Sequence, residues 1–433
     1  MTTTKNNEHK KLNLLSEREQ NQACLNSAEH EKNQGRKVLN VPNLRFPEFQ
    51  GEWEKCKLGD IANITGGYAF KSDTLNSIGG KYQVVKMGNL YQNQLDLHRS
   101  PSYTNILTSK AENVILRKGD IAITLTGTNN KRDFGYTYIF NDEKNLLLNQ
   151  RCGLIRTKGN PYFLSCLLKT YAFLNQFFES ATGGTGNQAN VSTKAMEMFS
   201  VNTPSLKEQK KIGELMALLD ERIATQNNII DKLQSLIKGI SNRLLYETEG
   251  KPVCIGDILL EHSERTRTNN QHEVLSSTVK GIFSQREYFS KDIASENNVG
   301  YKIIRLHDIV LSPQNLWMGN INYNDKFDIG IVSPSYKIFS IAECYDKRFI
   351  AAILKTHRAL YNYMLVSEQG ASIVRRNLNM EAFSQLVFKI PSLEKQREIG
   401  YAISLLKFRL ETANNIIRAY TSQKQHLLRQ MFI

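Results

Sequence analysis

Two loops contain the side-chain types that contact nucleic acid. The first, residues 126–132, follows the strand-like run 121–125 and reads Thr-Gly-Thr-Asn-Asn-Lys-Arg. Its hydroxyl, amide and cationic groups are those that contact phosphates and base edges. A solvated turn would use the same residues, so both interpretations stay open for this loop. The candidate contact residues are Thr126, Thr128, Asn129, Asn130, Lys131 and Arg132.

The second loop, residues 312–320, also follows a strand-like run and also carries amides. The positional match with the first loop favours a functional interpretation of both. Arg375 and Arg376 precede a helix and suit phosphate contact, whereas surface charge is the more common explanation for Arg265 and Arg267. The candidate contact residues are Gln314, Asn315, Trp317, Asn320, Arg375 and Arg376.

Motifs for catalysis are missing from the sequence. It contains no phosphate-binding GxxxxGK[ST], no HExxH, no G-x-S-x-G and no metal-spaced His/Cys cluster. The glycine run 183–186 follows a helix rather than a strand, which favours a flexible loop over a nucleotide site. We therefore expect no catalytic residue, no metal site and no cofactor in this chain.

Two long helices are expected to position the loops. Apolar residues recur in steps of three and four along Lys207–Tyr246, and the same rhythm recurs without a gap along Glu394–Ile433. A helix of about 40 residues is about 60 Å long, which exceeds an ordinary domain core. We favour an antiparallel helix pair over two helices in separate cores. Its expected interface residues are Ile212, Leu219, Ile223, Ile230, Leu233, Ile237, Ile399, Leu406, Leu410, Ile417, Tyr420 and Leu427.

The helices belong to an internal duplication. Pro-Ser-Leu at 204–206 recurs at 391–393, and Ile-Gly at 212–213 recurs at 399–400. In the regions before the helices, Leu-Gly-Asp-Ile at 58–61 is echoed by Ile-Gly-Asp-Ile at 255–258, and Lys-Gly-Asp-Ile at 118–121 by Leu-His-Asp-Ile at 306–309. One continuous helix is expected in each region, over 162–178 and 348–364. The pattern predicts an α+β protein in which two α/β domains are separated by the paired helices as a pseudo-two-fold repeat.

Five segments follow from this pattern. Residues 1–40 form a polar extension that we expect to be disordered, and 41–203 form the first domain. Residues 204–247 form the central helix, 248–390 the second domain and 391–433 the C-terminal helix.

Composition adds broad limits. The net charge of +14 makes an anionic partner plausible, although the surplus is spread along the chain and can also serve solubility. The six cysteines show no CxxC pair, which indicates reduced thiols in a cytoplasmic protein. No segment predicts a membrane span or a secretion signal.

These segments resemble the specificity subunits of type I restriction-modification enzymes. The resemblance runs from about residue 41 to the C-terminus, starting with Val-Pro-Asn-Leu-Arg-Phe-Pro at 41–47 and Trp53. Leu-Asn-Gln-Arg at 148–151 and the stretch 204–223 resemble internal signatures of the family, and 272–281 resembles its second-domain signature. The extension 1–40 departs from the family's start, and Lys407 replaces the helix aspartate found at Asp220.

The resemblance implies a DNA-recognition subunit without catalytic activity. Two target-recognition domains would each read one half of an interrupted, asymmetric site in double-stranded DNA. The helices would set the spacer and dock two methyltransferase subunits, which bring S-adenosylmethionine, while restriction subunits would bring ATP and Mg. Half-sites about one turn apart, roughly 34–36 Å, would then be expected. A coiled-coil scaffold whose variable domains bind protein is the alternative, and a self-sufficient methyltransferase or nuclease is a third possibility that the missing motifs disfavour.

Overall fold

The computed structural model describes residues 40–128, 131–142, 145–183, 188–246, 249–288, 297–369 and 376–433, with side chains left out at 241–246. These residues form mixed helices and strands in two compact units. Unit 1 contains residues up to Leu218 together with Lys424–Ile433, and unit 2 contains Leu219–Gln423. Both boundaries fall inside a long helix, so each helix contributes to both units. The expected extension 1–40, except for Asn40, lies outside the described residues.

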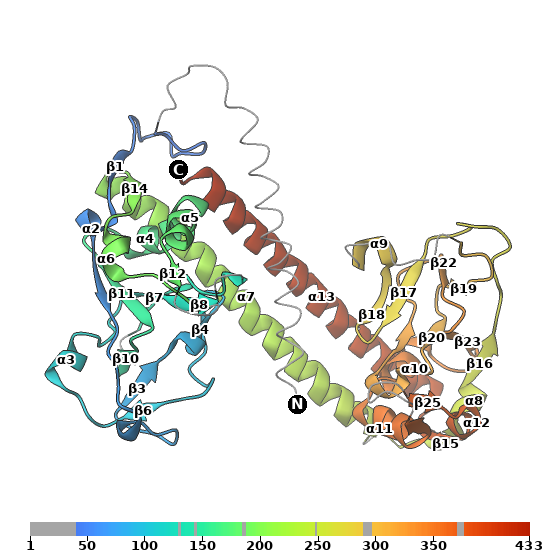
Figure 1. Ribbon diagram of the computed structural model, residues 1–433. Helices are drawn as coiled ribbons and strands as arrows, with labels where there is room; N and C mark the ends of the chain where they lie inside the picture. The colour runs from blue at the N-terminus through green and yellow to red at the C-terminus, as the bar shows by residue number, and fades with distance from the viewer. Residues whose placement is uncertain are drawn as a thin grey trace. The chain divides into compact units, whose positions relative to one another are not determined.

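The elements of unit 1 alternate short strands with short helices (Figure 1). They are β1 (Glu54–Lys57), α2 (Leu58–Ile61), β2 (Ala62–Gly66), η1 (Ser72–Thr74), β3 (Tyr82–Val85), η2 (Met87–Asn89), β4 (Leu90–Tyr91), β5 (Gln94–Leu95), β6 (Tyr103–Thr104), α3 (Ser109–Glu112), β7 (Ile121–Thr124), β8 (Thr126–Thr128), β9 (Thr137–Ile139), β10 (Leu146–Leu148), β11 (Cys152–Thr157), α4 (Pro161–Leu167), α5 (Tyr171–Glu179), β12 (Thr182–Gly183), β13 (Gln188–Asn190), α6 (Thr193–Glu197), β14 (Ser200–Thr203) and the first turns of α7 (Leu206–Tyr246).

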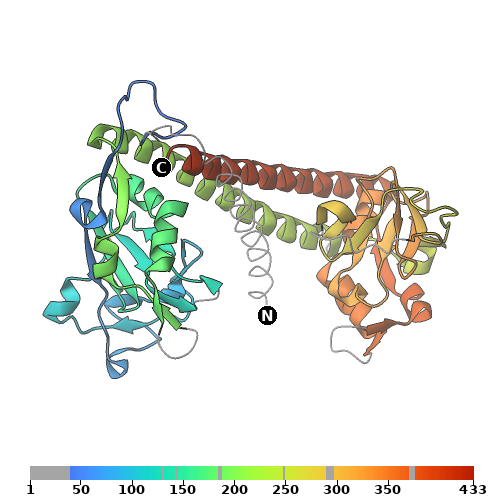
Figure 2. The same cartoon turned by 45° about the horizontal axis from the view of Figure 1, so that its top comes forward.

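A four-stranded antiparallel sheet in the order β2-β11-β7-β9 forms the centre of unit 1. Its apolar strands bury both faces, since Ile121, Ala122 and Ile123 are all inaccessible to solvent. On one face, Ala122 and Leu154 join a core with the second sheet, β10-β3-β6. The short helices lie beside the central sheet in both views (Figures 1 and 2).

The C-terminal residues complete unit 1. The Phe432 ring stacks on Phe163 with ring centroids 5.3 Å apart and meets Trp53 edge-on at 6.2 Å. The Leu44 amide donates a hydrogen bond to the Gln430 carbonyl over 2.8 Å. The end of the chain is thus packed against the segment that precedes β1.

The elements of unit 2 follow a similar order after the second part of α7. They are β15 (Lys251–Cys254), α8 (Ile255–Ile258), β16 (Leu259–His262), β17 (Leu275–Thr278), β18 (Gly281–Ser284), α9 (Gln285–Tyr288), β19 (Lys302–Arg305), β20 (Ile309–Leu311), η4 (Leu316–Met318), β21 (Ile321–Tyr323), β22 (Ile329–Val332), β23 (Lys337–Ile341), α10 (Lys347–Ile353), α11 (His357–Leu365), β24 (Ser367–Gln369), β25 (Arg376–Leu378), α12 (Met380–Ser384), β26 (Val387–Ile390) and α13 (Leu393–Gln430), whose last turns belong to unit 1.

The central sheet of unit 2 has the order β16-β23-β20-β21 and is also antiparallel. Alternation along β20 sends Ile309 and Leu311 into one core and Val310 into another. The first core contains apolar residues of α10, α11 and α12 together with Ile399 and Ile403 of α13. The second core is shared with the two-stranded pairs β17–β18 and β19–β22.

The prediction of one continuous helix in each domain, over 162–178 and 348–364, is wrong. Thr170 caps α5, because its Oγ1 accepts a hydrogen bond from the Phe173 amide over 3.3 Å. Thr356 caps α11 in the same way, accepting from the Ala359 amide over 3.2 Å. A threonine that bonds the third following amide begins a new helix, so each predicted helix is two short ones.

Candidate nucleic-acid interface

The first polar loop lies on an edge formed by β8 and β13. The two strands pair antiparallel, with Thr126 opposite Asn190 and Thr128 opposite Gln188. The Thr126 hydroxyl is buried and donates to Asn190 Oδ1 over 3.0 Å, so it faces the strand pair rather than solvent. A Cβ on Gly127 would lie 2.7 Å from the Phe134 side chain, which explains why the close approach at this position uses glycine.

An aspartate fixes the far end of β8. The Asp133 carboxylate accepts hydrogen bonds from the Thr128 amide over 2.6 Å and from the Thr128 hydroxyl over 3.3 Å. Lys131 and Arg132 stand exposed between them. Arg132 has a left-handed backbone with φ of 45°, and its guanidinium lies 5.1 Å from the centroid of the Phe178 ring. Asn129 and Asn130 lie outside the described residues.

A cavity of about 370 Å³ opens beside this loop. Thr126, Gly127, Thr128 and Asp133 line it, and so do Met87, Arg151 and Gln188. Arg151 and Gln188 were not predicted as contact residues, although Arg151 ends the signature-like segment 148–151. Gln188 follows the glycine run 183–186, of which 184–186 lie outside the described residues.

The second polar loop meets the strand β25 in unit 2. The Arg376 amide donates to the Gln314 carbonyl over 3.1 Å, and its guanidinium lies 5.2 Å from the centroid of the Trp317 ring. A guanidinium over an indole face is a favourable cation–π arrangement. Arg376 was predicted from a different part of the sequence, and the fold brings it to the loop. Arg375 lies outside the described residues.

Two asparagines of the second loop have structural roles. Asn320 is 5% exposed, and its side chain accepts from the Ser277 hydroxyl over 2.9 Å and donates to the Ser277 carbonyl over 3.1 Å. The Asn315 carbonyl accepts from the Met318 and Asn320 amides and so closes the turn. We therefore leave Thr126 and Asn320 out of the proposed DNA surfaces, because their polar side-chain atoms are used inside the fold.

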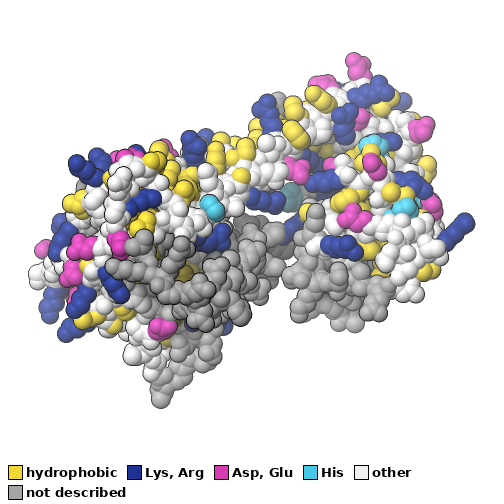
Figure 3. Space-filling model, turned by 90° about the horizontal axis from the view of Figure 1, so that it is seen from above, with side chains coloured by type: hydrophobic (Ala, Val, Ile, Leu, Met, Phe, Trp, Pro, Cys, Tyr) yellow, Lys and Arg dark blue, Asp and Glu magenta, His cyan; other side chains and the backbone are white. Residues whose placement is uncertain are grey.

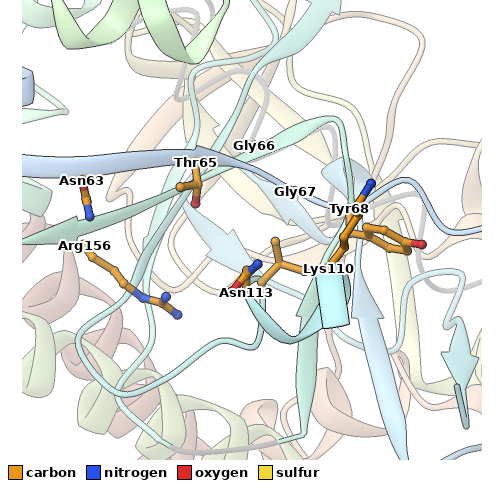
Figure 4. A pocket seen from close by; sticks show the side chains of 9 residues that line it. Asn63, Thr65, Gly66, Gly67, Tyr68, Lys110, Asn113 and Arg156 are labelled. Atoms are coloured by element: carbon orange, nitrogen blue, oxygen red, sulfur yellow. The ribbon is translucent and has the colours of Figure 1, made fainter. Parts of the chain in front are cut away.

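Another polar cavity, of about 380 Å³, lies at the end of β2 (Figure 4). Lys110 and Arg156 are its cations, and Asn63 and Thr65 add polar side chains from β2. Arg156 is committed to the fold, because it binds both carboxylate oxygens of Asp120 over 2.9 Å and donates to the Ile115 carbonyl over 2.8 Å. The site therefore offers less free positive charge than its composition indicates.

The remaining acid–base and charge features concern a buried thiol, possible metal ligands and the surface cations. Burial raises the pKa of Cys152 to about 12, so this thiol stays protonated and is a poor nucleophile near neutral pH. Within the described ranges, no three His, Cys, Asp or Glu side chains are grouped to hold a metal ion, and no helix is long and apolar enough to cross a membrane. Lys and Arg side chains are scattered over the face seen from above (Figure 3).

The helix-seam residues are all at least partly buried. Ile212, Leu219, Ile230 and Ile399 are 8% exposed or less, and the other eight predicted residues are of intermediate exposure. Ile399 packs in the core of unit 2, where α13 begins. Met216 and Ile403 were missed because the prediction followed one narrow apolar stripe along each helix. Both residues lie outside that stripe and are buried near the start of their helices.

Comparison with known proteins shows which family part of this chain resembles. Residues 50–235 match the family described as the type I restriction modification DNA specificity domain. This match covers β8, β13 and the cavity beside them. It confirms the resemblance drawn from the sequence, and this part of the chain is similar to the specificity subunits of type I restriction enzymes.

Particular relatives are distant. The chain is 30% identical over 194 residues to the type I restriction enzyme EcoAI specificity subunit of Escherichia coli, which covers 44% of this chain and 31% of that protein. It is 24% identical over 193 residues to the HindI specificity subunit of Haemophilus influenzae, covering 44% and 40%. The aligned part thus spans only 31% and 40% of the length of these relatives. The crystal structure of a type I restriction-modification system S subunit from M. genitalium has the same fold, with a TM-score of 0.61, 14% identity, and 91% and 99% of the two chains covered.

Proposed function

We propose that this chain is the DNA sequence-specificity subunit of a type I restriction-modification complex. The observation that carries the proposal is the family match over residues 50–235, which contains the polar surface formed by β8 and β13. Unit 2 supports it independently, because its central sheet has the corresponding strand order and the polar loop after β20 carries Trp317, beside which Arg376 of β25 lies. Each domain would read one half of a bipartite, asymmetric site in double-stranded DNA.

The two long helices would pair as an antiparallel coiled coil and act as the spacer between half-sites. Two contacts within unit 2 support this pairing. The Gln226 side chain donates to the Ala413 carbonyl over 3.1 Å, and the Arg222 guanidinium lies 6.0 Å from the centroid of the Tyr420 ring. As the α7 residue number falls from 226 to 222, the α13 number rises from 413 to 420, which is the sense expected of an antiparallel pair.

The same proposal includes the partners and the division of the chain. The helices would dock two methyltransferase subunits carrying S-adenosylmethionine, and restriction subunits carrying ATP and Mg would join them in the cytoplasm. This chain would hold no cofactor and catalyse no step. Residues 41–203 and 248–390 would be the target-recognition domains, related by a pseudo-two-fold axis, and 204–247 and 391–433 the helices.

DNA binding by the chain with its methyltransferase partner tests the proposal. Affinity for the methylated motif should fall steeply between 50 and 200 mM salt, as for proteins that neutralise several phosphates. Trp317→Ala and Arg376→Ala should each weaken binding about tenfold or more without preventing complex assembly. Lys347→Ala, an exposed cation at the start of α10, is the matched control. Salt-independent binding, or capture of protein without DNA, would favour the scaffold alternative.

Spacer length tests the role of the helices. Inserting one heptad into both α7 and α13 should lengthen the spacer of the methylated motif. The half-site sequences should stay unchanged, because the insertions do not alter the two target-recognition domains. The motif is measured by sequencing the methylated genome of a host that expresses the complex. An unchanged spacer would refute the proposal that the helices set the spacer length.

A further inference from the structure

The cavity beside β8 contains two polar side chains that the fold leaves available. Arg151 and Gln188 both line it, both are exposed, and the side chain of neither makes a hydrogen bond or ion pair within the described part of the chain. The other charged residue of the cavity is Asp133, whose carboxylate oxygens accept hydrogen bonds from the Thr128 amide and hydroxyl. The cavity therefore has donors without partners, together with an acceptor whose oxygens are in use.

Rigid elements hold both side chains. Gln188 begins β13 and is opposite Thr128 in the strand register. Arg151 lies in the turn before β11, and its carbonyl accepts a hydrogen bond from the Leu125 amide over 3.0 Å, just before β8. Side chains on a strand, or on a turn whose backbone is bonded to a neighbouring segment, lose less entropy on binding than side chains on a free loop, so this arrangement suits recognition rather than general charge.

The chemistry of the two side chains distinguishes purines. A guanidinium donates two parallel hydrogen bonds to guanine O6 and N7, and a glutamine amide donates to and accepts from adenine N7 and N6. We propose that Arg151 reads a guanine and Gln188 reads an adenine in the half-site bound by unit 1. This inference rests on the proposed function and adds to it the residues and bases of one half-site.

The cavity floor explains why these two residues are favoured over their neighbours. Thr126 is buried and bonded to Asn190, and Gly127 presents only backbone. Arg132 lies over the Phe178 ring outside the residues that line the cavity. Lys131 and Arg132 are thus suited to phosphate contact, which carries no sequence information.

The test is the methylated motif written by the intact complex in a host genome. It compares the wild-type chain with Arg151→Ala, Arg151→Lys, Gln188→Ala and Gln188→Glu. Arg117→Ala is the control, because Arg117 is an exposed arginine of unit 1 that does not line the cavity. Co-purification with the methyltransferase subunit and thermal unfolding show that each variant is assembled and folded.

Arg151→Ala should lower the preference for guanine at one position about tenfold or more, and Arg151→Lys should restore part of it. Gln188→Ala should relax an adenine position in the same half-site, and Gln188→Glu should shift that position toward cytosine, whose N4 group donates to a carboxylate. The other half-site and the spacer should not change.

Three results would overturn the inference. They are an unchanged motif in both alanine variants, relaxed positions in different half-sites, and a general loss of methylation by Arg151→Ala that lysine does not restore. Failure of the proposed function looks different, because the wild-type complex would then write no bipartite motif at all.

Discussion

The two units share the half of each domain that faces its helices and differ in the other half. In both, a four-stranded antiparallel sheet has the corresponding order, β2-β11-β7-β9 and β16-β23-β20-β21. Unit 1 covers one face of this sheet with β10-β3-β6, which contains a parallel strand pair, whereas unit 2 uses the separate pairs β17–β18 and β19–β22. The difference indicates that packing against the helices constrains the four-stranded sheet, whereas the strands on its other face are free to vary.

The repeated sequence around each helix start has a common structural cause. Gln209 donates to the Thr203 hydroxyl over 2.9 Å and to the Pro204 carbonyl over 3.0 Å, and its Oε1 accepts from the Asn160 amide over 3.4 Å. In unit 2, Gln396 donates to the Pro391 carbonyl and accepts from the Asp346 amide, both over 2.9 Å. Each glutamine thus ties the start of the long helix to the residue that caps α4 or α10.

One feature of unit 1 has no counterpart in unit 2. Glu208, 1% exposed, binds the Arg45 guanidinium over 2.7 and 2.8 Å and accepts from Trp53 Nε1 over 3.3 Å. The corresponding position in α13 is Lys395, which makes an exposed ion pair with Glu398. The segment 40–53 therefore holds the start of the first long helix through a buried ion pair, which the described start of the second helix lacks.

Removal of Arg45 is expected to change stability more than any other substitution that distinguishes the two helix starts. Arg45→Ala leaves the buried Glu208 carboxylate without its cation, and we expect a loss of about 4 kcal/mol in the free energy of unfolding. Lys395→Ala should cost less than about 0.5 kcal/mol, because its pair is exposed. Urea unfolding measures both. Equal costs would mean that the two helix starts are equivalent after all.

Two helix glycines test the shared docking. A Cβ on Gly213 would lie 2.1 Å from Asn160 Oδ1, and one on Gly400 would lie 2.5 Å from Asp346 Oδ1. We expect Gly213→Ala and Gly400→Ala each to cost about 2–3 kcal/mol by urea unfolding, because overpacking displaces a helix cap.

The control is Gly239→Ala, which has nothing within 4 Å and should be neutral or stabilising by up to about 1 kcal/mol. If only one of the two docked glycines tolerated alanine, the docking would not be shared.

A smaller effect is expected at the turn before β7 and β20. Gly119 and His307 occupy corresponding positions and are both left-handed, with φ of 87° and 78°. We expect Gly119→Ala to cost about 1 kcal/mol in thermal unfolding because a Cβ is disfavoured in this conformation. His307→Asn should change stability by less than about 0.5 kcal/mol, since asparagine tolerates it. A neutral Gly119→Ala would show that the turn relaxes.

A further expected effect is a pH dependence in unit 2. Burial and the nearby Lys407 charge lower the pKa of Lys355 to about 8, while its ammonium donates to Asn322 Oδ1 over 2.6 Å. Because the folded pKa lies below the ordinary lysine value, the unfolded chain binds more protons between pH 8 and 10.5, and stability should rise with pH there.

Lys355→Met should remove this contribution. The quantity to measure is the difference in unfolding free energy between the wild type and the variant from pH 7.5 to 9.5. The exposed control Lys347→Met should show no such trend, and a flat difference for Lys355→Met would contradict the assignment.

Local patterns predicted the elements well where a signal lies within a few residues. The strand around 121–125 and both long helices are confirmed, because a short apolar run and a helical period of apolar residues both report directly on burial. The breaks at Thr170 and Thr356 were missed because an N-cap in the middle of an apolar pattern does not interrupt its periodicity. The candidate residues Asn129, Asn130 and Arg375 lie outside the described residues and stay predictions.

The sequence by itself predicted the duplication, the two polar loops and the similarity to specificity subunits, because identical residues at a fixed offset need no coordinates to be recognised. Tertiary structure decided which polar groups are available. The Asn320 side chain is hydrogen-bonded to Ser277, the Arg156 guanidinium is paired with Asp120, and the Arg376 guanidinium lies beside the Trp317 ring. Side-chain pairing depends on segments distant in sequence that meet only after strands align, so a list of polar residues cannot separate those that hold the fold from those left to bind DNA.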